Sequence, residues 1–243
     1  MRIGFGRAVL VVVLSLVAAG ALFFATLPGV AGLAKHDPPT TAFIEQRRAR
    51  LRSEGRDDRI ERVFVPMSRI APVLGRAVIL TEDQNFYRHH GIDWEATRLA
   101  LESDLDKRRL KVGGSTITQQ LAKNLYLSPA RTPWRKLREM AIALEMERLL
   151  PKSRILELYL NSIEWGERVY GAEAAARHYF GHSAARMSPG EAATLAAMIA
   201  SPRLFQPGHP SRRLQRRTAR ILRWLGRSGR LERGGEHSPM LHD

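Results

Sequence analysis

The pattern of apolar and polar positions begins with an uninterrupted apolar segment near the amino terminus. Residues 8–27 carry no charge, and Arg2 and Arg7 precede them. As a helix, a segment of this length spans about 30 Å, the thickness of the hydrocarbon core of a bilayer. The two arginines favour a cytoplasmic location for residues 1–7. The pattern therefore predicts a single transmembrane anchor over residues 8–27, with the rest of the chain outside the cytoplasmic membrane. A cleaved signal peptide, whose apolar region is usually shorter, is the alternative.

Residues 28–58 are interpreted as a juxtamembrane linker. The segment contains the pair Pro38-Pro39 and a short basic stretch at residues 46–52. Basic residues close to a membrane attract anionic headgroups, with about 1 kcal/mol for each residue. A solvated helix explains the same stretch equally well, so both interpretations stay open.

From Arg59 onward the apolar periodicity is mostly helical. The predicted helices cover residues 77–80, 94–105, 133–150, 155–159 and 188–200. Residues 63–65 predict a brief strand before Pro66, and we find no internal repeat. The periodicity ends after Gly226, so residues 227–243 are expected to be disordered. The pattern thus predicts one mainly α domain over residues 59–226.

The charge balance indicates an anionic partner. The chain has 39 Lys and Arg against 24 Asp and Glu, a formal net charge of +15 in 243 residues. Such an excess is typical of proteins that meet nucleic acid, anionic lipid or a phosphorylated substrate. Because the predicted domain lies outside the cytoplasmic membrane, no nucleic acid is expected as a partner. The chain has no cysteine, which excludes a disulfide, a thiol nucleophile and a cysteine-ligated metal.

Two adjacent carboxylates, Glu82 and Asp83, follow the apolar residues 77–80 and precede a loop that ends at Gly91. Aliphatic packing around a carboxylate raises its pKa and suits it to exchange protons near neutral pH. A solvated helix end is the more frequent explanation when this pattern stands alone. The acid–base hypothesis therefore depends on polar groups elsewhere in the chain.

A glycine-rich loop leads into a helix whose first residues have a capping-box pattern, Thr116 with Gln119. Gln120 and Lys123 are three residues apart, so their side chains can point the same way. Such a helix start suits an anion. A capped amphipathic helix with a solvated lysine explains the stretch as well.

Basic residues then surround one carboxylate. Arg135 and Glu139 have the i,i+4 spacing of a helical ion pair, with Arg131, Lys136 and Arg138 beside them. The group is either a surface ion pair of small energetic value or a carboxylate whose basic neighbours also hold phosphate.

Together these motifs resemble the signatures of the peptidoglycan glycosyltransferases, glycosyltransferase family 51, in the family's order over residues 60–226. The matching stretches are Glu82-Asp83-x-x-Phe86-x-x-His89-x-Gly91, Gly114-x-Thr116-x-x-Gln119-Gln120-x-x-Lys123-Asn124, Arg135-Lys136-x-x-Glu139, the segment 152–181, and the alanine-rich helix that runs into Ala200-Ser201-Pro202. The transpeptidase motifs of multidomain members, Ser-x-x-Lys and Lys-Thr-Gly, do not occur. The chain therefore resembles the monofunctional biosynthetic type.

The resemblance implies a polymerase of lipid II, the lipid-linked disaccharide-pentapeptide precursor. Glu82 is then the general base that takes the proton from the 4-hydroxyl of the acceptor GlcNAc. That oxygen attacks C1 of the donor MurNAc with inversion and expels polyprenyl diphosphate. Glu139 is the second catalytic carboxylate. The substrate-binding positions that the resemblance implies are Asp83, Phe86, Ser115, Gln119, Gln120, Lys123, Asn124, Arg131, Arg135, Lys136 and Asn161.

The family resemblance also implies a fold and a set of partners. The expected domain is mainly α and lysozyme-like, with a small membrane-proximal lobe around residues 105–135. Expected partners are lipid II, the nascent glycan chain, membrane lipids and other cell-wall synthases. The sequence requires no cofactor, and Glu139 is the candidate ligand should Mg²⁺ or Mn²⁺ accompany the diphosphate. Residues 205–207, Phe-Gln-Pro, depart from the Tyr-Asn-Pro of many members, so no contacts are inferred there.

Two other functions remain as alternatives. A lytic or hydrolytic muramidase also uses a glutamate with carboxylate support on a lysozyme-like fold. A hydrolase of neutral glycan, however, does not need Lys123, Arg131 and Arg135 around its second carboxylate. A non-catalytic, membrane-anchored scaffold of the cell-wall machinery is the other alternative, and it does not depend on the acidity of Glu82.

Overall fold

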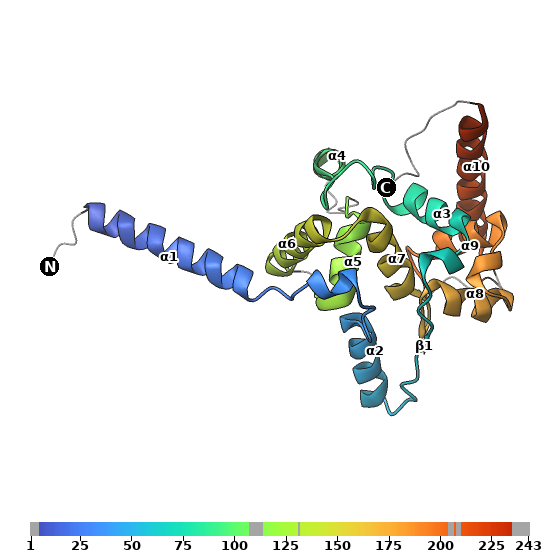
Figure 1. The fold of residues 1–243 in the computed structure, drawn as a ribbon, viewed down its shortest axis with the longest axis horizontal. Helices are drawn as coiled ribbons and strands as arrows, with labels where there is room; N and C mark the ends of the chain where they lie inside the picture. Colours follow the sequence, from blue (N-terminus) through green and yellow to red (C-terminus); the bar gives the residue numbers. More distant parts are fainter. Residues whose placement is uncertain (1–4, 107–113, 131, 204–206, 208–209, 235–243) are drawn as a thin grey trace.

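The fold is mainly α, as the sequence predicts. The computed structural model describes residues 5–106, 114–130, 132–203, 207 and 210–234 (Figure 1). The α-helices are α1 (Phe5–Ala25), α2 (Ala42–Ser53), α3 (Pro72–Glu82), α4 (Trp94–Asp106), α5 (Ile117–Tyr126), α6 (Pro133–Leu149), α7 (Lys152–Ser162), α8 (Ala172–Phe180), α9 (Pro189–Met198) and α10 (Arg212–Gly234). Short 3-10 helices are η1 (Ala31–Ala34), η2 (Met67–Arg69) and η3 (Ala184–Arg186).

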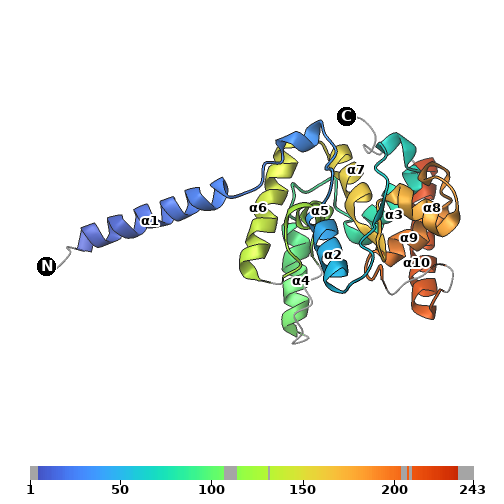
Figure 2. The same cartoon turned by 90° about the horizontal axis from the view of Figure 1, so that it is seen from below.

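Helix α5 lies at the centre of the core and packs against α2, α6 and α7 (Figure 2). Its residues Ile117 and Leu121 are four apart, so they share one face, and both are fully buried. Each such side chain stabilises the fold by about 1.5–3 kcal/mol. Helix α5 falls within residues 105–135, where a small membrane-proximal lobe is expected, and its buried apolar side chains are part of the hydrophobic core.

The alanine-rich helix α9 lies between α3 and α10. It begins with the capping box that Ser188 forms with Glu191, and its alanines are buried. Small side chains allow the neighbouring helices to approach closely. Helix α10, which was not predicted from the sequence, buries Leu214 and Ile221 against this layer. Helix α10 extends to Gly234 and so overlaps the segment expected to be disordered, whose remainder, 235–243, lies outside the described residues.

A small sheet of β1 (Glu61–Arg62), β2 (Glu164–Gly166) and β3 (Val169–Tyr170) has the order β1-β3-β2. Strand β1 is parallel to β3, and β2 is antiparallel to it. The predicted strand at residues 63–65 is wrong, because β1 ends at Arg62, just before the predicted residues. Val65 instead makes two backbone hydrogen bonds to the side chain of Asn161.

Helix α2 packs into the body of the protein. Thr41 caps the helix by accepting a hydrogen bond from the N–H of Ile44, and Ile44 and Leu51 are buried. Within the basic stretch 46–52, the Arg47 side chain is buried and forms an ion pair of 2.7 Å with Glu167. This part of the expected linker is therefore an amphipathic helix that contributes to the core.

Helix α1 extends away from the rest of the molecule (Figure 1). Where it ends, the Phe23 ring packs edge-on against Trp134 of α6, with centroids 5.0 Å apart. The Arg138 guanidinium of α6 donates to the carbonyl oxygen of Thr26 (2.7 Å) and to its hydroxyl (3.0 Å). Over the residues that the structure describes, none of the helices combines the length and apolarity that a membrane crossing requires.

Candidate active site

Glu82 is the last residue of α3, as the sequence predicts. The helix begins with Pro72 at its first position and buries Leu74 and Val78, which fix it in the core. It ends because Asp83 leaves the helical conformation, with φ −162° and ψ 77°. The apolar face of α3 therefore holds Glu82 at a fixed point where the helix meets the cavity.

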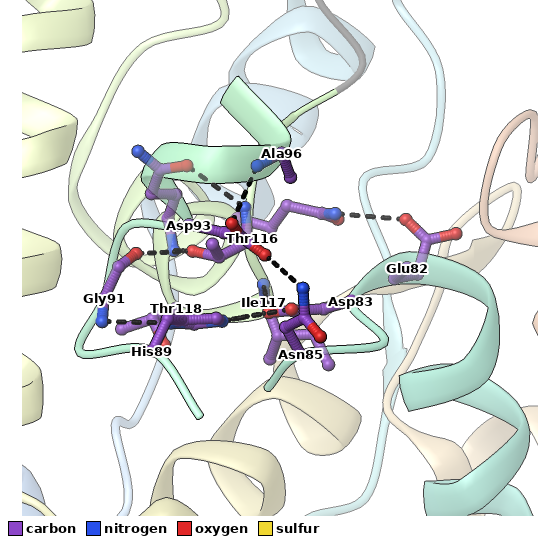
Figure 3. Close-up of polar contacts among 12 residues, drawn as sticks. Glu82, Asp83, Asn85, His89, Gly91, Asp93, Ala96, Thr116, Ile117 and Thr118 are labelled. Atoms are coloured by element: carbon purple, nitrogen blue, oxygen red, sulfur yellow. Dashed lines mark hydrogen bonds and ion pairs between the residues drawn. The ribbon is translucent and has the colours of Figure 1, made fainter. Parts of the chain in front are cut away.

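The carboxylate of Glu82 is half-buried, and among the described residues it accepts one hydrogen bond, from Gln120 Nε2 to Oε2 at 3.0 Å (Figure 3). Burial raises the pKa of Glu82 above its ordinary value. The Gln120 hydrogen bond and the positive charges of Arg217 and Lys123 oppose this shift, and the charge of Asp83 adds to it. A carboxylate with a raised pKa, and with one oxygen to which no described residue donates, is suited to accept a proton.

Asp83 is buried and organises the loop after α3. Its carboxylate accepts hydrogen bonds from the backbone N–H of Ile117 (2.9 Å) and from His89 Nε2 (2.9 Å), as Figure 3 shows. The Nδ1 atom of His89 accepts from the Gly91 N–H, so the ring carries its proton on Nε2. His89 Nε2 also lies 3.0 Å from the second oxygen of Asp83, so both oxygens are engaged, and Asp83 fastens the loop that follows Glu82.

A second set of bonds fixes the same loop. The Thr116 hydroxyl donates to the Gly91 carbonyl at 2.6 Å. Gly91 has φ +89°, and a Cβ there would lie 3.1 Å from the carbonyl oxygen of Ala143, so only glycine fits. Further along, Asn85 Nδ2 donates to Asp93 Oδ2 at 2.9 Å, and Asp93 also caps the start of α4. The loop is thus fastened to α4 and α5.

Glu139 of α6 is buried between two cations. Arg135 Nη1 and Lys136 Nζ each lie 2.5 Å from one of its oxygens. Lys136 Nζ also donates to Ser115 Oγ at 3.0 Å. Buried ion pairs of this kind hold their members in place because separating them leaves an unpaired charge. Glu139 therefore fixes the direction of both cations.

Lys123 of α5 completes what we call the cationic cluster, defined as Lys123, Arg135 and Lys136. Burial lowers the pKa of Lys123; the charge of Glu139 opposes this shift. The charges of Arg135 and Lys136 lower the pKa further, so the three cations lie close enough to repel one another. A cluster with more positive than negative charge is suited to bind a diphosphate.

A cavity of about 280 Å³ opens beside Glu82. Its lining residues come from the end of α3, the start of α4 and the loop before α5: Thr81, Glu82, Asp83, Gln84, Asn85, Asp93, Ala96, Gly114, Ser115 and Thr116. Ser115, which contacts the cationic cluster through Lys136, is part of this lining. One wall of the cavity, at Ser115, therefore contacts the cluster, and Glu82 is part of the same lining.

The structure brings most of the predicted site residues together. Those around the cavity and the cationic cluster are Glu82, Asp83, Ser115, Gln120, Lys123, Arg135, Lys136 and Glu139. Arg131 lies outside the described residues.

Four residues that were predicted to contact substrate are buried in the fold. Phe86 is a core residue beneath Lys152, whose Nζ lies 4.5 Å from the ring centroid. Gln119 completes the capping box of α5, and Asn124 donates to a backbone carbonyl in the same helix. Asn161 uses its amide to hold the backbone of the strand-like segment after β1. Asn161 thus uses both of its amide groups within the fold, and Gln119 and Asn124 each use one.

Two neighbours of the site were not predicted from the sequence. Arg217 of α10 acts on Glu82 through its charge, and the spacing of Leu214 and Ile221 was the available signal for that helix. Tyr159 of α7 is fully buried, and its hydroxyl donates to Gln120.

A divalent metal ion does not fit at Glu139. Both carboxylate oxygens are occupied by the ion pairs with Arg135 and Lys136. Among the described residues, no group of three or more His, Asp or Glu side chains is arranged to hold a metal ion.

Comparison with known proteins agrees with this geometry. The family model described as transglycosylase matches residues 49–225. A protein of Laribacter hongkongensis named biosynthetic peptidoglycan transglycosylase is 48% identical over 188 residues, which are 77% of this chain and 82% of that protein. A protein of the same name from Nitrosospira multiformis is 48% identical, over 76% of this chain and 81% of that protein. A third, from Bordetella pertussis, is 47% identical, over 78% of this chain and 80% of that protein.

The matched region contains the whole candidate site, from Glu82 to Arg217. It begins within α2, in agreement with the packing of that helix into the core. Because the match covers most of the chain, and these relatives cover more than two-thirds of it at well above 30% identity, the chain belongs to the transglycosylase family.

Proposed function

We propose that the protein polymerises lipid II into peptidoglycan glycan strands, with Glu82 as the general base. The observation that carries this proposal is a half-buried carboxylate of raised pKa in a cavity whose lining residue Ser115 accepts a hydrogen bond from the cationic cluster. The family membership and the names of the relatives support the same reaction.

In this reaction Glu82 takes the proton from the 4-hydroxyl of the acceptor GlcNAc. The hydroxyl oxygen forms a bond to C1 of the donor MurNAc as the bond from C1 to the diphosphate oxygen breaks, with inversion at C1. The electron pair of the breaking bond leaves with the polyprenyl diphosphate. Negative charge then develops on the leaving oxygen, and the cationic cluster stabilises it without rearrangement. Glu139 contributes by holding Arg135 and Lys136 in place.

We also propose that the protein acts at the cytoplasmic membrane, where a lipid-linked substrate is found. In this arrangement residues 1–7 are cytoplasmic, residues 8–27 form a single-pass anchor, and the catalytic domain lies on the periplasmic side. The support is the uncharged sequence of residues 8–27 and the exposure of its apolar side chains, such as Leu16 (68% exposed).

The faces of α4 and α6 support the same location. They expose the large apolar side chains Trp94, Leu99, Trp134, Leu137 and Leu144. Exposed apolar patches of this kind mark membrane or protein contact surfaces. The end of α1 reaches α6 next to Trp134, so an anchored α1 would bring this surface to the bilayer. We therefore assign the membrane-proximal lobe to α4 and α6.

The deciding experiment incubates the purified protein with lipid II and, separately, with finished glycan. We expect polymer from lipid II and no shortening of the glycan. A muramidase would shorten the glycan without forming polymer. A scaffold would retain its cellular function in the Glu82→Gln variant, whereas we expect that variant to lose polymerisation and complementation.

A further inference from the structure

A chain of hydrogen bonds runs from the buried core to Glu82 through three helices. The Tyr159 hydroxyl of α7 donates to Gln120 Oε1 of α5 at 2.9 Å. Gln120 Nε2 in turn donates to Glu82 Oε2 of α3 at 3.0 Å. Tyr159 is fully buried, so its hydroxyl has no bulk water as an alternative partner.

The chemistry of the two ends fixes the direction of this chain. An ionised carboxylate only accepts hydrogen bonds, so Gln120 must present its NH₂ group to Glu82. The amide oxygen of Gln120 then faces Tyr159 and requires a donor there. Burial, together with the charges of Glu82 and Asp83, raises the pKa of Tyr159 well above its ordinary value. Tyr159 therefore stays protonated, and its hydroxyl donates a hydrogen bond to Gln120 Oε1.

We propose that Tyr159 is a positioning residue for the general base, because its hydroxyl holds the Gln120 amide in the orientation that donates to Glu82 Oε2. The described residues give Glu82 Oε1 no hydrogen bond. That oxygen is thus left to accept the proton of the incoming hydroxyl. The inference rests on the proposed function of Glu82 as a base, and it assigns a role to a residue that does not touch substrate.

A packing role alone does not explain the hydroxyl. Burying a phenol oxygen costs free energy unless it is hydrogen-bonded, and a phenylalanine fills nearly the same volume. If Tyr159 served only to fill the core, its replacement by phenylalanine would leave the properties of Glu82 unchanged. The hydroxyl is therefore the group to test.

The other charged groups that face Glu82 come from separate elements. They are Lys123 of α5, Arg217 of α10 and the neighbouring Asp83. None of the three has a hydrogen bond to Tyr159. Removing the Tyr159 hydroxyl therefore changes the hydrogen-bond chain and leaves these charges in place.

The experiment uses the full-length protein and its Tyr159→Phe variant. Glutamate labelled with ¹³C at the carboxyl carbon allows the titration of Glu82 to be followed by NMR, with Glu82→Gln identifying its signal. The Gln120 hydrogen bond lowers the pKa of Glu82, so we expect the variant to titrate at higher pH. The acidic limb of the polymerisation rate should move in the same direction, with kcat about tenfold lower and KM unchanged.

The matched control is Tyr170→Phe, a buried tyrosine on β3 outside the site. It should leave the titration of Glu82 unchanged. In a double-mutant cycle, Gln120→Leu should raise the pKa of Glu82 by itself, and Tyr159→Phe should add nothing in that background. The Gln120→Leu variant keeps the test informative if Tyr159→Phe does not fold.

Two results would overturn the inference. One is a Glu82 titration that is the same in Tyr159→Phe, or in Gln120→Leu, as in the parent protein. The other is a further loss of kcat when Tyr159→Phe is added to Gln120→Leu. The titration needs no substrate, so it separates this inference from the proposed function: a parent protein that makes no polymer contradicts only the latter.

Discussion

The carboxylate of Asp83 accepts a hydrogen bond of 2.9 Å from the backbone N–H of Ile117, the first residue of α5. This bond joins the end of the helix that carries the candidate base to the start of the helix that carries Lys123. A negative charge at a helix amino terminus is favourable, since the free N–H groups and the helix dipole point toward it. The bond therefore sets the relative positions of Glu82 and the cationic cluster.

We expect Asp83→Ala to destabilise the protein strongly. The change leaves the Ile117 N–H and His89 Nε2 without their acceptor in a buried location, at a cost of about 2–4 kcal/mol in the free energy of unfolding. Chemical denaturation of the two proteins measures the loss. The exposed neighbour Gln84 is the control, and Gln84→Ala should stay within about 0.5 kcal/mol. Equal losses in both variants would contradict the role given to Asp83.

Glu82 should make both activity and stability depend on pH. Activity requires the ionised base, so the polymerisation rate should fall as the pH drops below the raised pKa of Glu82. Stability should move in the opposite direction. Because the folded protein binds the Glu82 proton more tightly than the unfolded chain, its stability falls as the pH rises from the unfolded pKa through the folded one.

Glu82→Gln separates these two effects. The variant should lose polymerisation by at least about 10²-fold. Because the variant has no carboxyl group at position 82, its stability should fall less than that of the parent protein as the pH rises. Melting experiments on both proteins at several pH values would measure this difference. A Glu82→Gln variant that becomes less stable relative to the parent protein as the pH rises would show that the carboxylate is stabilising and that its pKa is not raised.

The cationic cluster should hold the donor. We expect Lys123→Ala to weaken donor binding by about 10- to 100-fold, which corresponds to one charge-assisted hydrogen bond. Arg131→Ala should act in the same way if the family resemblance places Arg131 correctly. Binding of a non-reacting lipid diphosphate would measure the effect. Arg148→Ala serves as the control, since Arg148 is exposed on α6 and pairs only with Glu145 among the described residues. Unchanged affinity in both site variants would refute the diphosphate role.

Asn161 should matter for folding and not for substrate affinity. Its side chain bonds to both backbone groups of Val65 and to the Glu157 carbonyl. Asn161→Ala leaves these buried groups unpaired, so we expect a loss of about 1–3 kcal/mol in the free energy of unfolding. Thermal melts and KM measurements on the same preparation distinguish the two roles. A raised KM with an unchanged melting temperature would return Asn161 to the substrate site.

Local signals in the sequence predicted the elements that carry the site. The end of α3 at Glu82 and the capping box of Thr116 with Gln119 both appear in the structure where the pattern places them. These features depend on residues a few positions apart, whose interactions a linear sequence displays directly. The strand near residues 63–65 was misplaced because short apolar runs do not define a strand register.

Contacts between distant segments were not predictable in the same way. Phe86 and Asn161 lie in family motifs, and the motif alone does not tell which side of the helix or loop meets the core. The bond from Tyr159 to Gln120 joins α7 to α5, and Arg217 reaches Glu82 from a helix that was not predicted. Such pairings arise from tertiary packing, which only the folded structure specifies.

The attachment of α1 to α6 has a consequence for recombinant work. Arg138 and Trp134, which hold the end of α1, stand on the same helix as Arg135, Lys136 and Glu139. A truncation that removes the first 27 residues would take the Phe23 ring away from Trp134, which is already partly exposed, and would remove the Thr26 oxygens that accept from Arg138. Both changes lie within one turn of Arg135 and Lys136 on α6. We therefore expect kinetic constants from such a shortened enzyme to include an effect on the donor site.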